Sequence, residues 1–167
     1  MNQEKLGGPV EYGKFVVLVV ILVVIANLIG KQTGAVTGDG RVMELSMGLF
    51  FGTFGLLKIL KLKDFALAFQ GYDLIAGRLP IYGYLYPLIE LALCAMFLAS
   101  WQIIPASILT IIVMTVSVLS TGYILYIKKR IPCACAGLFI KLPLSKVTLL
   151  EDTAMIAMAV ILLTKYV

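Results

Sequence analysis

Long apolar runs, separated by short charged segments, are the feature that most limits what this chain can fold into. The runs cover residues 15–29, 43–60, 81–100, 105–127 and 147–164. A helix needs about 20 predominantly apolar residues to cross the hydrocarbon core of a bilayer. The sequence therefore predicts an all-α integral membrane protein, a bundle of five membrane-crossing helices with little mass outside the bilayer.

The composition and charge support this prediction. Of the 167 residues, 61% are hydrophobic and only 14% are charged, which is far more apolar than a soluble domain. The net charge of +5 arises from Lys and Arg beside the apolar runs, so membrane lipids with anionic headgroups are the expected partners, and nucleic acid is not. The chain has no histidine, which excludes imidazole zinc sites and Ser-His or Cys-His nucleophile pairs.

The first two runs differ in character. Residues 15–29 predict a short, retained membrane helix rather than a secretory signal, because Asn27 falls late in the run and residues 30–34 lack a small-x-small cleavage site. In the second run Gly48, Gly52 and Gly55 leave one face of the helix without side chains, so another helix can approach closely. We expect residues 1–42 to form an N-terminal helix with its linker, and residues 43–167 to form the main membrane domain.

The mixed segment at residues 61–79 predicts an amphipathic helix lying along the membrane interface. Its apolar side chains recur at helical spacing, whereas several charged side chains would have to enter hydrocarbon if it crossed. The apolar positions are Leu62, Phe65, Phe69, Tyr72 and Ala76.

The second half of the chain predicts a helical hairpin followed by a last helix. Trp101 and Gln102 form a minimal turn between the third and fourth runs. The final helix begins near Val147, where Thr148-x-x-Glu151 is typical of a capping box and acidic side chains favour the positive end of the helix dipole.

Positive charges on alternate sides of five crossings predict the orientation. Eleven Lys or Arg residues fall on the side of the N-terminus and three on the other side. Since cytoplasmic loops are enriched in Lys and Arg, we expect a prokaryotic cytoplasmic (inner) membrane protein with its N-terminus inside. The segment around Cys133 and Cys135 would then face the cytoplasm.

Cys133-Ala134-Cys135 is the most specific chemical feature. It follows the basic run at residues 128–130, and nearby positive charge lowers the pKa of a thiol. Two thiolates suit thiol-disulfide exchange or near-linear binding of Cu(I) or a mercuric ion, whereas zinc wants four ligands. A disulfide between them closes a tight ring that is easily reduced, which favours a transient redox role. The alternative is that both cysteines are small residues packing a turn, and Cys94 is expected to be a small core residue.

Glu90 is a second candidate because it lies about three turns into a membrane helix. A carboxylate in hydrocarbon costs several kcal/mol and is usually turned inward, paired or protonated. Lys58 and Asp152 approach the membrane from the same side and are candidate partners. A structural polar clamp is as good an explanation as a functional role.

Met43 and Met47 are one helical turn apart near the outer end of the second run, and Met155 and Met158 are a similar pair in the last. Thioethers on one face suit a path for soft cations. Methionine is also an ordinary filler of gaps in cores, and both interpretations stay open.

Several of these motifs together resemble the DoxX/MauE family of redox-associated membrane proteins, over about residues 43–164. The resembling segments are Lys63-Asp64-Phe65, Tyr72-Asp73-Leu74-Ile75-Ala76, Tyr84-x-Tyr86-Pro87-x-x-Glu90, Cys133-Ala134-Cys135-Ala136-Gly137, Lys141-Leu142-Pro143-Leu144 and Val147-Thr148-Leu149-Leu150-Glu151-Asp152. The Cys-x-Cys segment with its Leu-Pro and Glu-Asp followers is the most specific of them.

The resemblance implies a four-helix core, to which residues 15–29 add one helix. Some similar chains carry a heavy-metal-associated domain before such a helix, and the fourteen residues that precede it here contain no Cys-x-x-Cys motif. Members similar to the methylamine-utilisation branch are associated with thiol-disulfide traffic during maturation of periplasmic enzymes. That task would place the cysteines outside, in conflict with the charge count.

Two mechanisms follow from these residues. In the redox version one thiolate of Cys133 or Cys135 attacks a disulfide of a thioredoxin-like partner, the other resolves the mixed disulfide, and Glu90 or Asp152 manages protons. In the transport version Met43 and Met47 receive Cu(I) or a mercuric ion outside, and the cysteine pair delivers it inside, for example to a heavy-metal-binding protein. A structural subunit without chemistry of its own is a third alternative, and homo-oligomerisation is left open.

Overall fold

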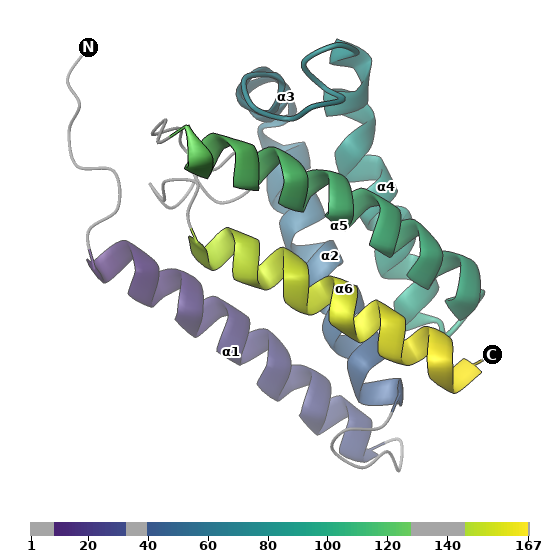
Figure 1. Cartoon of the computed structure of the whole chain (residues 1–167). Helices are drawn as coiled ribbons and strands as arrows, with labels where there is room; N and C mark the ends of the chain where they lie inside the picture. The colour runs from purple at the N-terminus through teal and green to yellow at the C-terminus, as the bar shows by residue number, and fades with distance from the viewer. Residues whose placement is uncertain (1–8, 33–39, 128–145, 167) are drawn as a thin grey trace.

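The computed structural model describes residues 9–32, 40–127 and 146–166, and within these ranges it contains six α-helices and no strand (Figure 1). The helices are α1 (Pro9–Gln32), α2 (Gly40–Leu60), α3 (Leu62–Gln70), α4 (Pro80–Leu98), α5 (Ile103–Tyr126) and α6 (Lys146–Tyr166). Five of them are long and lie in one bundle, while the short α3 sits at one end of it (Figure 1). The predicted all-α membrane fold is confirmed.

α2 and α4 pack closely through the glycine face of α2. A β-carbon placed on Gly48 would lie 2.8 Å from Leu98 Cδ2, and one placed on Gly52 would lie 2.8 Å from Cys94 Sγ. These distances leave no room for a side chain on either glycine. The glycine spacing therefore does what the sequence predicted, and Cys94 is a half-buried packing residue.

α5 and α6 form the second close pair and lie side by side along most of their length (Figure 1). A tight turn at residues 99–102 connects α4 to α5, with Ser100 and Gln102 at positive φ values of 50° and 54°. The predicted hairpin is thus present. The four-helix core consists of α2, α4, α5 and α6.

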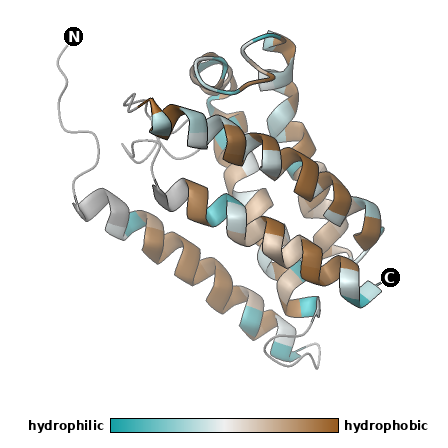
Figure 2. Ribbon diagram, viewed as in Figure 1, coloured by the Kyte–Doolittle hydropathy of each residue, from teal (hydrophilic) through white to brown (hydrophobic). Residues whose placement is uncertain are grey.

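α1 is the additional N-terminal helix, and in the described ranges it packs against α2 and no other helix. Phe15 contacts Phe54, with ring centroids 5.9 Å apart. Most of its other residues between Val16 and Ile29 are apolar and exposed, and Figure 2 shows its middle turns in brown. Such a surface suits contact with lipid tails.

The prediction of one continuous helix over residues 61–79 is wrong in its length, because α3 ends at Gln70 and turns follow to Leu79. The reason is local: Asp73 Oδ1 accepts hydrogen bonds from the backbone N–H groups of Ile75 (2.9 Å) and Ala76 (2.8 Å), which favours a turn over a helix. Four of the five predicted apolar positions, Phe65, Phe69, Tyr72 and Ala76, are nevertheless buried, and Leu62 is half-buried.

Four helices of the described part have the length and apolarity to cross a membrane, and they are α1, α2, α4 and α5. The expected fifth crossing, α6, carries Glu151, Asp152 and Lys165 and is not among them. It does extend from one end of the bundle to the other, because Tyr166 in its last turn reaches Glu44 in the second turn of α2.

Candidate functional site

The cysteine pair predicted to carry the chemistry, Cys133 and Cys135, lies outside the described residues. The segment that contains it joins the C-terminal end of α5 to the N-terminal end of α6. α3 and the turns of residues 71–79 lie at the same end of the bundle, because Leu74 N–H donates a hydrogen bond of 3.1 Å to Ser120 Oγ of α5. The polar groups near that end of the bundle are therefore the described residues to consider as part of a functional site.

Lys58 of α2 and Glu90 of α4 form a buried ion pair, in which Lys58 Nζ donates a hydrogen bond to Glu90 Oε1. Lys58 is 1% exposed and Glu90 is 2% exposed. The pairing that the sequence suggested is thus present. Because both charges are removed from water, each depends on the other for its stabilisation.

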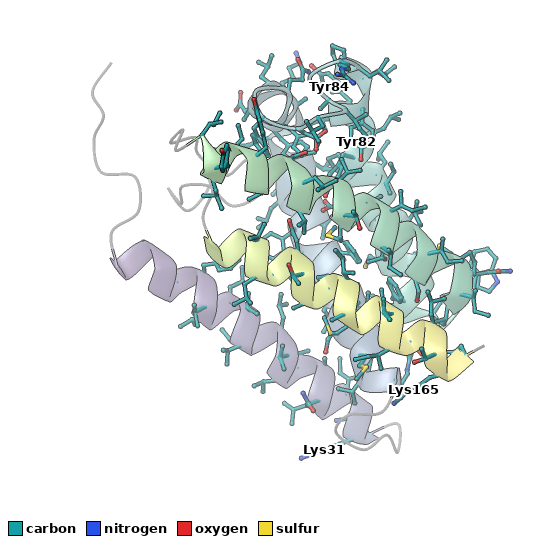
Figure 3. The ribbon with its side chains drawn as sticks, viewed as in Figure 1. Lys31, Tyr82, Tyr84 and Lys165 are labelled. Carbon is teal, nitrogen blue, oxygen red and sulfur yellow. The ribbon has the colours of Figure 1, made fainter. Side chains whose placement is uncertain are left out.

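Aromatic rings surround the ammonium of Lys58. Its Nζ lies 4.7 Å from the centroid of the Tyr86 ring and 5.4 Å from that of Phe65. Both distances fall within the range of a cation–π interaction. Tyr82 stands in the same cluster, 5.8 Å from Tyr86 between ring centroids, at the end of the bundle where it is labelled in Figure 3.

The second carboxylate oxygen of Glu90 has no hydrogen-bond partner in the described part of the chain. A buried polar atom without a hydrogen-bond partner is uncommon in folded proteins. This oxygen is positioned to accept a hydrogen bond or a proton. The arrangement is compatible with both a clamp and a functional role.

Asp152, the other predicted proton carrier, belongs to a separate site between α5 and α6. Ser117 Oγ donates a 2.7 Å hydrogen bond to Asp152 Oδ2, and Asp152 is 8% exposed. The structure thus gives Glu90 and Asp152 different hydrogen-bond partners. Asp152 lies in the second turn of α6, close to the end at which the cysteine segment joins it.

Asp73 is a buried polar residue that the sequence analysis did not select. It is 4% exposed, and its Oδ2 lies 3.2 Å from Ser120 Oγ. Its signal in the sequence is an aspartate whose side chain can accept hydrogen bonds from the backbone N–H groups two and three residues further along the chain. It fixes the turns after α3 to α5.

A second missed cluster lies at the opposite end of the bundle and centres on Glu44, which is completely buried. Glu44 accepts hydrogen bonds of 2.5 Å from both Ser100 Oγ and Tyr166 Oη. Arg41 lies 3.2 Å from Glu44 and donates a 3.0 Å hydrogen bond to the carbonyl of Leu98. The only local signal was the spacing of Arg41 and Glu44, which puts them one helical turn apart.

Buried hydroxyl groups line the inner face of α5. The side-chain oxygens of Ser107, Thr110 and Thr121 have no hydrogen-bond partner in the described ranges. Together with Ser117 and Ser120 they are three, seven, three and one residues apart, which keeps them on one broad side of the helix. The interior of the four-helix core therefore contains more polar groups than the apolar composition of the chain suggested.

The predicted methionine ligands occupy two environments. Met47 is completely buried in the core, whereas Met43 lines an apolar groove between α1, α2 and α6 with a volume of about 450 Å³. Met155 and Met158 line the same groove. Among the described residues, no cluster of three or more His, Cys, Asp or Glu side chains is able to hold a metal ion.

Comparison with known protein families identifies a match over most of the chain. The family model described as "Methylamine utilisation protein MauE" matches residues 39–165, which span α2 to α6. No curated protein and no solved structure matches the chain. Since the family model covers most of the sequence and all four helices of the core, this chain belongs to the MauE family of membrane proteins.

Proposed function

We propose that this protein exchanges thiols and disulfides with a thioredoxin-like partner at the surface of a prokaryotic cytoplasmic membrane, through Cys133 and Cys135. The observation that carries the proposal is the Cys-x-Cys pair itself, which directly follows the basic run at residues 128–130. Positive charge raises the thiolate fraction, and the thiolate is the reactive form. Membership of the MauE family supports a role in a membrane.

The exchange transfers two electrons in two steps. One thiolate of the pair attacks a partner disulfide, so that a mixed disulfide forms and the partner releases one thiolate. The second cysteine then attacks the mixed disulfide, which closes the Cys133–Cys135 disulfide and releases the partner's other thiolate. The partner is reduced, this protein is oxidised, and the two protons that leave the thiols end on the partner. The reverse sequence oxidises a partner dithiol.

Asp152 is the better placed of the two proposed proton carriers. At about 1.5 Å per residue it lies about 9 Å along α6 from the end that joins the cysteine segment, whereas Glu90 lies about 15 Å along α4 from its start. Its contact with Ser117 holds the carboxylate in place. Glu90, held by Lys58, is proposed to act from deeper in the bundle.

Trapping of mixed disulfides tests this function. In cells that express Cys133→Ser or Cys135→Ser, the second thiol is missing and a mixed disulfide with the partner cannot be resolved. One of the two variants should therefore accumulate a covalent complex that a reducing agent cleaves. Non-reducing electrophoresis and mass spectrometry would identify it. Cys94→Ser is the matched control and should behave like the natural chain, because Cys94 packs against Gly52. Full function with both Cys133 and Cys135 replaced by Ser would show a structural subunit instead.

The side that the cysteines face is a separate question. The charge count favours the cytoplasm, whereas maturation of periplasmic enzymes would require the outside. A membrane-impermeant maleimide applied to intact cells should leave Cys133 and Cys135 unlabelled until the membrane is permeabilised. Immediate labelling would reverse the proposed orientation.

Handling of a soft metal is the second candidate, and the observation in its favour is that Met43, Met155 and Met158 line one groove. Thioethers and thiolates both prefer Cu(I) and mercuric ions. In this version the purified protein should bind about one such ion per cysteine pair, and expression should change the copper or mercury content of cells. If the copper and mercury content of the cells is unchanged and a mixed disulfide is trapped, the redox function is supported and metal handling is rejected.

A further inference from the structure

The groove between α1, α2 and α6 is an apolar feature of the described residues that the proposed thiol-disulfide exchange does not use. It has a volume of about 450 Å³, and side chains from all three helices line it. α1 and α6 do not pack against each other, so the groove is the space that separates them. On α1 the lining extends from Phe15 to Asn27, which corresponds to a length of about 18 Å.

The width of the groove indicates which kind of molecule fits into it. The space open to the centre of a water molecule is about 450 Å³, which over about 18 Å corresponds to a width of about 5 Å. Adding the radius of a water molecule, about 1.4 Å, on each side makes the groove about 8 Å wide. An α-helix with its side chains is about 10 to 12 Å across, which excludes a helix of a partner or of a second copy. Carbon atoms in contact lie about 3.5 to 4.0 Å apart, so a single hydrocarbon chain fits.

The charges at one end of the groove indicate the headgroup. Lys31 lies in the last turn of α1 and Lys165 in the last turn of α6, and both side chains are exposed at the same end of the bundle (Figure 3). Asn27 lines the groove one turn before Lys31. On α6 the lining ends at Met158, two turns before Lys165, so both ammonium groups lie beyond the same end of the groove, where they are complementary to an anionic phospholipid headgroup.

We propose that this groove binds one anionic phospholipid, with an acyl chain between α1 and α6 and its phosphate beside Lys31 and Lys165. The lipid then connects α1 to the four-helix core through a second contact, in addition to α2. The proposal is independent of the chemistry of the cysteines, but it assigns to a lipid the groove that soft-metal handling would use, because Met43, Met155 and Met158 line it.

Native mass spectrometry of the detergent-purified full chain tests the proposal. After passage through nanodiscs of phosphatidylglycerol and phosphatidylcholine, the protein should retain one phospholipid, with phosphatidylglycerol preferred. The preference should fall about fivefold for each of Lys31→Gln and Lys165→Gln, the factor that corresponds to about 1 kcal/mol per basic residue at an anionic surface. A bound second chain, or no bound lipid, would overturn the proposal.

Variants that fill the groove separate specific from general lipid binding. Ala154→Phe places a ring in the groove and should abolish retention, whereas Ala157→Phe, on an exposed position of the same helix outside the lining, should leave it unchanged. Val20→Phe on α1, with Val17→Phe as its control, repeats the test if Ala154→Phe does not fold. Equal retention by the groove variants and their controls would show that the lipid sits elsewhere.

Discussion

The ammonium of Lys58 and the carboxylate of Glu90 are both withdrawn from solvent inside an apolar bundle, where an isolated charge is costly. The ion pair, together with the contacts of Lys58 with the rings of Phe65 and Tyr86, compensates for the loss of hydration of the two charges. Replacing one partner leaves the other charge buried without compensation. The two side chains therefore behave as one unit, whatever their role in function.

We expect Lys58→Met to destabilise the protein by about 3 to 5 kcal/mol, because it leaves Glu90 buried without its cation. The double variant Lys58→Met with Glu90→Gln should recover much of the loss. The free energy of unfolding in mixed detergent micelles measures both. Lys63→Met, at an exposed position of α3, is the control and should be neutral. A double variant as unstable as the single one would contradict the coupling.

α2 owes its central position to glycines at which a side chain would collide with α4. Gly48, Gly52 and Gly55 all face α4, and their nearest neighbours are Leu98, Cys94 and Leu91. In a membrane, helices associate through close packing rather than through exclusion of water. The distance between these two helices thus depends on the absence of three side chains.

Gly52→Ala should lower the stability by about 1 to 3 kcal/mol, because the added methyl group overlaps Cys94 Sγ. Gly122→Ala is the matched control: nothing lies within 4 Å of its new β-carbon, and alanine favours a helix by up to about 1 kcal/mol over glycine. Combining Gly52→Ala with Cys94→Ala should restore most of the loss. Thermal unfolding of the purified variants distinguishes these outcomes, and equal effects at Gly52 and Gly122 would disprove the packing argument.

The two ends of the bundle are held by different polar clusters. Glu44 connects the start of α2 to the end of α6 through Tyr166 and to the α4–α5 turn through Ser100. At the other end, Asp73 connects the turns after α3 to Ser120 of α5. The bundle thus combines an apolar outer surface with polar contacts between helices inside.

Tyr166→Phe removes one hydrogen bond to a charged group, so we expect a loss of about 1.5 to 3 kcal/mol in the free energy of unfolding. Hydrogen exchange should also increase in the last turns of α6. Tyr123→Phe, which alters an exposed tyrosine of α5, should change neither quantity. If α6 stays equally protected without the hydroxyl group, Glu44 does not hold that end of the bundle.

The match between expectation and structure differs along the chain for physical reasons. The helix of residues 61–79 was predicted too long, because helical spacing of apolar side chains reports which residues are buried and not whether the backbone is continuous. After Gly71 caps α3, Asp73 holds the chain in turns by accepting hydrogen bonds from the backbone N–H groups of Ile75 and Ala76. Cys133 and Cys135 remain predictions from the sequence, as they lie outside the described residues.

The sequence by itself determined the long helices and the glycine face of α2, because run length and side-chain spacing are local properties of the chain. The four-helix core followed from the family resemblance. Only the tertiary structure decided that Glu90 pairs with Lys58 rather than with Asp152, and that Glu44 contacts Tyr166. Glu44 and Tyr166 are 122 positions apart, and Lys58 and Glu90 are 32 apart. It also decided that α1 stands away from α6 and leaves a groove between them. Such contacts depend on how the helices are placed around one another, which no local pattern specifies.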